Sequence, residues 1–171
     1  MPSLSYDEIK DGNHFEELVA AYFNSLKSIT GTNVTHVEVF PSGIGPDHGV
    51  DIIVEFIVTD LIKEFKRKWI VQCKFLNRNI KSEDISDIYI PQLIYSYGAC
   101  GYLLICKQRP TNKLVTHFKN LNLSCKEKYS YEIWTGEEFK GKLYSAPQII
   151  HQQFFTRYFD ELKLIDSKIE K

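Results

Sequence analysis

Two apolar runs with strand character constrain the fold of this chain more than any other feature. Residues 50–58 and 69–75 are rich in β-branched and aromatic residues, and the hydrophilic segment 63–68 lies between them. Short apolar runs of this composition favour strands. Because the connection has about ten residues and no helical period, the two runs predict a β-hairpin at the centre of the fold.

The patterns around this hairpin predict a mixed sheet flanked by helices. A further strand precedes the hairpin, and helices then alternate with strands towards the C-terminus, which is the order expected of an α/β fold. The predicted strands outside the hairpin are 34–40, 100–106 and 131–134. The predicted helices are 13–26, 82–97 with a kink at Pro91, 112–121, 137–143, and one that begins at Pro147 and presents its apolar residues on one side.

Composition indicates one compact domain in a reducing compartment. The chain has 171 residues, 43% of them hydrophobic, which is enough for one core. It shows neither a membrane-length apolar run nor a signal peptide, so we expect a cytoplasmic protein without membrane contact. Cys73, Cys100, Cys106 and Cys125 lack zinc-site spacing, and three of them lie in or beside apolar runs, which suits buried, reduced thiols.

Polar residues stand within the two central strands. In the second apolar run, Gln72 and Lys74 share one face, while Cys73 points to the opposite face. Long polar side chains are costly in a buried strand unless they have partners or open onto a cleft. Asp51 stands at the mouth of the neighbouring strand, after a turn in which Gly49 lets the backbone approach a ligand closely. We therefore expect a site built from the ends of both strands.

Several short motifs carry a family resemblance. The chain has Asp-His-Gly-Val-Asp at 47–51, Gln-Cys-Lys at 72–74 and Phe-Glu-Glu-Leu-Val at 15–19. The strand 101–106 and the segment 131–139, with its Gly-Glu-Glu turn, follow in order. In this order and spacing the chain resembles the Mrr-like branch of the PD-(D/E)XK restriction endonucleases, in which Gln-x-Lys replaces the commoner Glu-x-Lys. The resemblance implies a restriction endonuclease-like fold, α/β with a central mixed sheet.

The resemblance also implies a metal-dependent catalytic site. Asp51 and the backbone carbonyl of Cys73 would bind Mg2+, for which Mn2+ would substitute, with Gln72 offering an amide oxygen and Glu16 a carboxylate from the first helix. Lys74 would orient the attacking water and stabilise the charge of the transition state. Because glutamine lacks the charge of glutamate, Glu16 matters more here than in Glu-x-Lys relatives.

The loop before Asp51 contains two further polar residues. Pro46-Asp47 matches the letters PD in the name of the PD-(D/E)XK superfamily, but the residue that matches the metal-binding aspartate is Asp51. Asp47 would shape the turn or support the ligands. His48 lies next to the implied metal and would contact a phosphate or act in proton transfer, although a turn histidine is more often simply exposed.

Each of these residues also has an ordinary structural interpretation. Asp51 could cap a turn, and Glu16 could be a solvated helix residue. Gln72 and Lys74 could form a polar pair at a sheet edge. Their occurrence together favours the catalytic interpretation.

The formal net charge of −1 gives no global attraction to nucleic acid, so any phosphate-binding surface must be local. One basic group lies in the hairpin connection, at Lys63, Lys66, Arg67 and Lys68. A second group follows the strand ends near the expected site and is better placed to bind DNA: Arg78, Lys81, Lys107 and Arg109.

The sequence thus predicts a Mg2+-dependent DNA endonuclease of the restriction type, acting in restriction or anti-phage defence. The alternatives are a non-cleaving nucleic-acid-binding or sensor module, a junction resolvase and an RNA nuclease. We expect residues 1–146 to form the nuclease core and 147–171 a packing extension, a dimerisation element or a connection to a larger protein. No reading domain is evident, so control would come from oligomerisation or from a fused or partner sensor.

Overall fold

The computed structural model describes residues 2–28, 33–41, 49–86, 88–124 and 129–169, and within them five strands form one sheet in the order β1-β2-β3-β4-β5. The strands are β1 (Val34–Pro41), β2 (Ile52–Thr59), β3 (Glu64–Lys74), β4 (Gly101–Cys106) and β5 (Ser130–Trp134). The first three pair antiparallel, whereas β4 and β5 run parallel to β3. The predicted mixed α/β sheet is confirmed.

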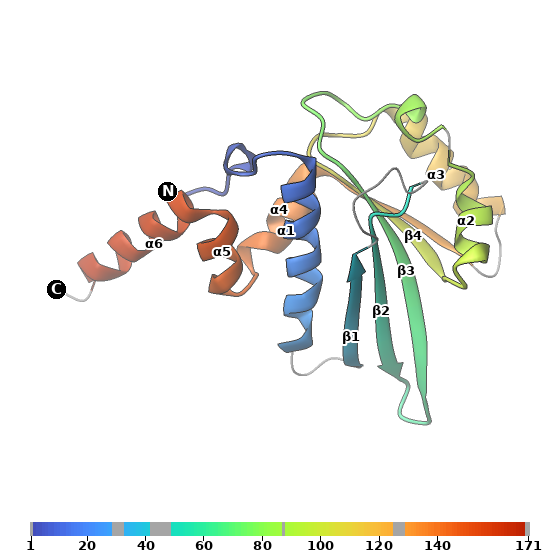
Figure 1. Ribbon diagram of the computed structural model, residues 1–171, viewed down its shortest axis with the longest axis horizontal. Coiled ribbons are helices and arrows are strands. Elements are labelled where there is room, and N and C mark those ends of the chain that lie inside the picture. Colours follow the sequence, from blue (N-terminus) through green and yellow to red (C-terminus); the bar gives the residue numbers. More distant parts are fainter. Residues whose placement is uncertain (1, 29–32, 42–48, 87, 125–128, 170–171) are drawn as a thin grey trace.

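Helices cover both faces of this sheet (Figure 1). One face packs against α1 (Gly12–Ser25), α4 (Gly136–Tyr144) and α5 (Gln148–Phe154). The other packs against α2 (Ile90–Ser96) and α3 (Asn112–Ser124), which form the two crossover connections between the parallel strands. Each face has its own apolar cluster, so β4 and the part of β3 from Ile70 to Cys73 are buried on both sides.

The hairpin is longer than the sequence predicted. We expected 63–68 to be a connection, but β3 begins at Glu64, and the β2–β3 ladder starts with the pair Thr59 and Glu64. Lys66 is exposed and forms a 2.8 Å ion pair with Glu55 on β2. Cross-strand charge pairs stabilise an exposed ladder, so a polar sequence here is compatible with a strand.

The single kinked helix predicted over 82–97 is wrong. A short 3-10 turn occupies Ser82–Ile85, and α2 begins only at Ile90. Pro91 lies in the first turn of α2, where its missing N–H is not required for helical hydrogen bonding. Proline therefore starts a helix here and does not bend one.

The C-terminal region also differs from its prediction, because the expected helix is divided into α5 and α6 (Thr156–Ile169). Phe155 interrupts it with φ −134° and ψ 59°, and its wholly buried ring joins the core. Ile149 and Ile165 are exposed, so the predicted single apolar stripe does not form. In Figure 1, α6 lies beyond α5, on the side away from the sheet. Within the described ranges, no helix has the length and apolar character needed to cross a membrane.

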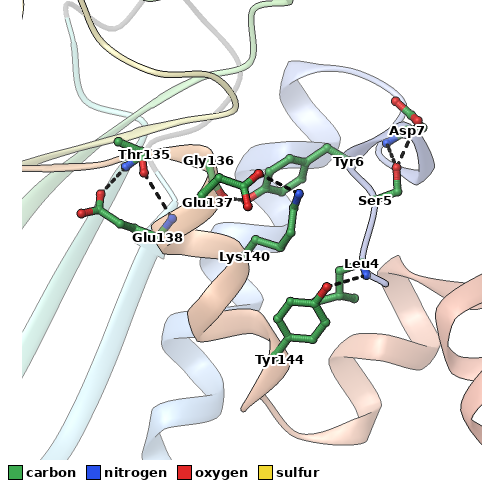
Figure 2. Close-up of polar contacts among 10 residues, drawn as sticks. All are labelled: Leu4, Ser5, Tyr6, Asp7, Thr135, Gly136, Glu137, Glu138, Lys140 and Tyr144. Carbon is green, nitrogen blue, oxygen red and sulfur yellow. Dashed lines mark hydrogen bonds and ion pairs between the residues drawn. The ribbon is translucent and has the colours of Figure 1, made fainter. Parts of the chain in front are cut away.

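Two hydrogen bonds join the N-terminal segment to α4, as Figure 2 shows. The hydroxyl of Tyr6 donates to the carbonyl of Gly136 over 2.7 Å, and the backbone N–H of Leu4 donates to the hydroxyl of Tyr144 over 3.1 Å. These contacts join residues more than 120 positions apart in the sequence. They hold the N-terminal segment against α4.

The predicted Gly-Glu-Glu turn forms the start of α4 (Figure 2). Thr135 accepts a hydrogen bond from the N–H of Glu138, whose carboxylate accepts one from the N–H of Thr135. This reciprocal capping fixes the helix directly after β5.

Candidate active site

One carboxylate lies where β2 begins beside β3. The N–H of Asp51 donates to the carbonyl of Val71 over 3.0 Å, and the regular β2–β3 ladder then ends at the pair Ile52 and Val71. The next N–H of β3 on this side belongs to Cys73, and it donates to Oδ2 of Asp51 over 2.6 Å. The carboxylate of Asp51 thus accepts the hydrogen bond that the backbone carbonyl of a further β2 residue would otherwise accept.

The turn before Asp51 requires glycine. Gly49 has φ +90°, in the left-handed region, and a Cβ there would lie 2.5 Å from Cδ1 of Ile88. Val50 follows, with 1% of its surface exposed. The close approach of Gly49 to Ile88 and the burial of Val50 fix the position of Asp51 directly before the first residue of β2.

Gln72 holds the same carboxylate oxygen. Its Nε2 donates to Oδ2 of Asp51 over 2.8 Å, and only 6% of the residue is exposed. Val71 and Cys73 pack in the cluster that faces α1, whereas Ile70 packs in the opposite cluster. The predicted alternation is confirmed, and it places Gln72 on the face of Ile70.

The thiol of Cys73 is part of the core. Burial and the nearby carboxylates raise its pKa well above the ordinary value, so the thiol stays neutral. The N–H and C=O of one strand residue point to the same side of the strand. Because the N–H of Cys73 contacts Asp51, its carbonyl faces the Asp51 side and can serve as an oxygen ligand.

Glu16 reaches the site from α1. The helix begins after Asp11, whose carboxylate accepts from the N–H of His14, and the ring of Phe15 lies 5.1 Å from that of Phe75 at the end of β3. Partial burial, then the charge of Asp51, raise the pKa of Glu16 to about 7, while the charge of Lys74 acts in the opposite direction. Glu16, Asp51 and Lys74 therefore lie within electrostatic reach of one another.

This pKa leads to a stability prediction. In the unfolded chain Glu16 ionises near 4.5, so between that value and about 7 the folded protein holds one more proton. Without metal, raising the pH from 5 to 8 should destabilise the wild type, and Glu16→Gln should remove about 1 kcal/mol of that loss, a figure reduced for partial solvent exposure. Urea unfolding in EDTA at both pH values measures this difference. Equal pH responses in the two proteins would contradict the assignment.

The donor atoms fit a hard divalent cation. Two carboxylates and one backbone carbonyl gather at one strand end, where the amide nitrogen of Gln72 contacts Asp51, and oxygen donors of this kind suit Mg2+ or Mn2+. Oε1 of Gln72 is buried and has no hydrogen-bond partner among the residues described. Groups of three or more His, Cys, Asp and Glu side chains suited to a metal are absent from the described part of the chain.

The second basic group gathers beside Lys74. The N–H of Lys107 donates to the carbonyl of Lys74 over 2.9 Å, and the N–H of Ile80 donates to the carbonyl of Arg109 over 2.9 Å. An isolated bridge between Ile80 and Pro110 adds to these contacts, so the loops after β3 and β4 lie side by side. The sequence prediction that these basic residues share one region agrees with this geometry.

The four basic side chains of this group differ in their availability. Arg78 holds both carboxylate oxygens of Asp84, at 2.8 and 2.7 Å, and this contact lowers the pKa of Asp84 to about 2. Lys107 contacts Asn77 at 2.6 Å, whereas Lys81 and Arg109 are exposed. Residue 48 lies outside the described residues, so the role predicted for His48 stays a prediction.

Tyr102 was not a site residue in the sequence interpretation. It belongs to an apolar run that predicts only a buried strand; burial raises the pKa of its hydroxyl far above the ordinary value, and the charge of Asp51 adds to this rise. A lone hydroxyl in an otherwise apolar strand was the available signal.

The family model described as a restriction endonuclease matches residues 9–119. The chain belongs to the restriction endonuclease family. This match confirms the resemblance to Mrr-like restriction endonucleases, and it includes Glu16, Asp51 and the Gln-Cys-Lys triplet.

Two solved structures are similar to this restriction endonuclease family member. The DNA modification-dependent restriction endonuclease AspBHI has 13% identity and a TM-score of 0.54, with 93% of this chain and 37% of that chain covered. The MspJI restriction endonuclease in complex with a 27-mer oligonucleotide has 13% identity and a TM-score of 0.50, with 92% and 32% covered. At this identity the likeness shows the fold, and the chain spans about a third of the length of either protein. No curated protein matches the chain.

Proposed function

We propose that this member of the restriction endonuclease family is a Mg2+-dependent endonuclease that hydrolyses phosphodiester bonds in DNA. The observation that carries the proposal is the carboxylate of Asp51, which is held by the N–H of Cys73 and the amide of Gln72 within reach of Glu16 and Lys74. These two hydrogen bonds from β3 hold the carboxylate in one orientation. A turn-capping aspartate would not need a lysine and a second carboxylate beside it.

The residues of the site divide the chemistry between them. Asp51, Glu16, the carbonyl of Cys73 and the amide oxygen of Gln72 would hold the cation, which when bound lowers the pKa of water and offsets negative charge on the phosphate. Lys74 would orient the attacking water and stabilise the charge that develops on the phosphate oxygens. Gln72 adds no charge, so Glu16 supplies the second negative charge of the ligand set.

DNA is the proposed substrate because of the family and the basic loops. Lys81 and Arg109 are exposed at the strand ends next to Lys74, where they can contact phosphates on either side of a scissile bond. MspJI, one of the similar structures, is in complex with an oligonucleotide. A cytoplasmic role in restriction or anti-phage defence fits a nuclease of this family.

Cleavage of supercoiled plasmid separates this proposal from its alternatives. We expect nicked and linear products with Mg2+ or Mn2+, none in EDTA, and recovery when the cation is restored. Binding without cleavage under all cation conditions would support a non-cleaving sensor module. Faster cleavage of RNA or of four-way junctions than of duplex DNA would support an RNA nuclease or a resolvase.

Arg109→Gln should weaken DNA binding through the loss of one phosphate contact. The dissociation constant for a short duplex, measured in EDTA, should rise about threefold, and the slope of log affinity against log salt should fall by about 1. Lys63→Gln is the matched control, since Lys63 is exposed beside the β2–β3 turn at the far end of the hairpin. Equal effects of the two substitutions would show that the loops after β3 and β4 do not contact the DNA.

We propose that cleavage is controlled by oligomerisation or by a fused or partner sensor domain. Residues 1–146 would form the nuclease core, and the exposed Leu164 and Ile165 of α6 give 147–171 an apolar surface for contact with a second copy or another part of a larger protein. Mass measurement in solution, alongside plasmid cleavage, tests whether active and inactive species differ in size.

A further inference from the structure

A surface groove lies between the segment that follows β3 and the exposed side of α3. Its volume is about 700 Å³, within the usual range of small-ligand sites. Asn112, Thr116 and Asn120 line it from α3, each one turn after the last and all exposed. Leu114 and Phe118 are the buried residues of this helix, so one wall of the groove is the polar face of α3.

The 3-10 turn after β3 and the residues at the start of α2 form the floor and the opposite wall (Figure 1). Ile85 and Ile88 line the groove and pack in the apolar cluster of this sheet face. Tyr89 also lines it, with 73% of its surface exposed and no capping hydrogen bond from its side chain to α2. The hydroxyl oxygen of Ser82, a further lining residue, is buried and has no hydrogen-bond partner within the described residues. The groove thus combines an apolar floor, an exposed aromatic ring and polar groups on both walls.

The groove adjoins the candidate active site. Gly49 lies two residues before Asp51, and a Cβ on Gly49 would be 2.5 Å from Cδ1 of Ile88, a residue of the groove floor. The exposed Lys81, one of the basic residues of the loops beside Lys74, directly precedes the lining residues of the 3-10 turn. A DNA strand with a phosphate at the active site therefore has the groove within reach of its neighbouring nucleotides.

The lining suits a nucleobase that has left the base stack. Aromatic rings stack on bases, and asparagine amides offer both the donor and the acceptor that a base edge requires. Among the described lining residues, Lys113 carries the one permanent charge, and its 3.3 Å ion pair with Glu83 is exposed on both sides. An exposed pair is weak, so Lys113 can exchange it for a phosphate. A base inside a duplex keeps both faces stacked, so only an unpaired base can lie against Tyr89.

We propose that this groove binds one unpaired nucleotide of the DNA substrate beside the bond that is cut. Tyr89 stacks on the base, and Asn112 and Asn120 contact its edge. The place of the groove in a cleavage reaction rests on the proposed function, whereas binding of the nucleotide is measured without catalysis.

Binding is measured in EDTA with a short duplex and with the same duplex carrying one unpaired thymine. The wild type should bind the bulged duplex about tenfold more tightly, the effect expected of one stacked base. Tyr89→Leu and Asn120→Ala should each remove this preference. The matched controls are Tyr95→Leu, on an equally exposed tyrosine of α2 outside the groove, and Asn24→Ala, on an exposed asparagine of α1, and both should retain it. Equal affinity of the wild type for the two duplexes, or a preference that survives in both groove variants, would overturn the proposal.

Free deoxynucleoside monophosphates distinguish a DNA nucleotide from a soluble one. They should compete only weakly with the bulged duplex, because they lack the neighbouring phosphates that the basic loops bind. Full displacement at micromolar concentrations would assign the groove to a free nucleotide and would overturn the proposal.

The positions of the cuts test the relation of the groove to the active site. In Mg2+ the wild type should cut at a fixed distance from the unpaired thymine, and the cut should move with the thymine along the duplex. Tyr89→Leu should lose this register. Cuts that do not follow the thymine would overturn the placement of the nucleotide beside the cleaved bond. A wild type that prefers the bulged duplex but cuts no DNA would refute the proposed function alone, since the nucleotide site would still be supported by binding.

Discussion

Asp51→Asn should lose Mg2+-dependent cleavage by at least about a thousandfold, together with measurable binding of the cation. Asparagine has nearly the same shape, and its oxygen can still accept from the N–H of Cys73, so the local backbone structure at the start of β2 should be retained. The negative charge is lost, however, and a second carboxylate oxygen is replaced by an amide donor. Substitution by asparagine therefore removes the ligand with little change in packing.

The measurements for Asp51→Asn are Mn2+ binding and plasmid cleavage on the same preparation. Asp160→Asn is the matched control, because Asp160 is exposed on α6 and its loss should change neither quantity. Wild-type metal affinity in Asp51→Asn would show that the cation binds elsewhere.

Lys74→Met should reduce cleavage by about a hundredfold to a thousandfold, the usual effect of removing one group that stabilises transition-state charge. Methionine retains an unbranched apolar stem at the end of β3, so folding should persist. Metal affinity should change only a few-fold, because Lys74 influences Glu16 through its charge and is not a ligand. The two substitutions thus separate metal binding from catalysis.

Single-turnover cleavage at saturating Mn2+ measures the effect of Lys74→Met. Lys63→Met serves as the control, since it makes the same change at the opposite end of the hairpin. Full activity of Lys74→Met would exclude Lys74 from the chemistry, and a loss of Mn2+ binding equal to that of Asp51→Asn would make Lys74 a structural residue.

Much of the fold could be predicted because local patterns and packing agree. The helix at 13–26 was expected from its apolar stripe, and α1 buries Phe15, Leu18, Val19 and Phe23. The burial of β4 on both faces follows from its continuous apolar run. Alternation in β3 predicted the opposite faces of Gln72 and Cys73, because the period of a strand is fixed.

The predictions failed where tertiary contacts override local patterns. The polar half of β3 forms a strand because its backbone continues the ladder with β2, and Lys66 pairs with Glu55 across that ladder. Phe155 breaks the last helix because its ring is buried in the core. In both cases the deciding contact is made with another element of the fold.

The candidate site shows the same division. The motifs indicated Asp51, Gln72, Lys74 and Glu16 by type and order, but they did not reveal that Asp51 completes the β2–β3 ladder. Hydrogen-bond partners across strands follow from register, which apolar patterning leaves unspecified.

Titration of Mn2+ into the metal-free wild type, with free Mn2+ and plasmid cleavage followed in the same samples, tests the central claim most directly. The account predicts that cleavage rises with the occupancy of one class of site and that both curves disappear in Asp51→Asn. Cleavage without Mn2+ uptake, or uptake and cleavage that persist in Asp51→Asn, would contradict it.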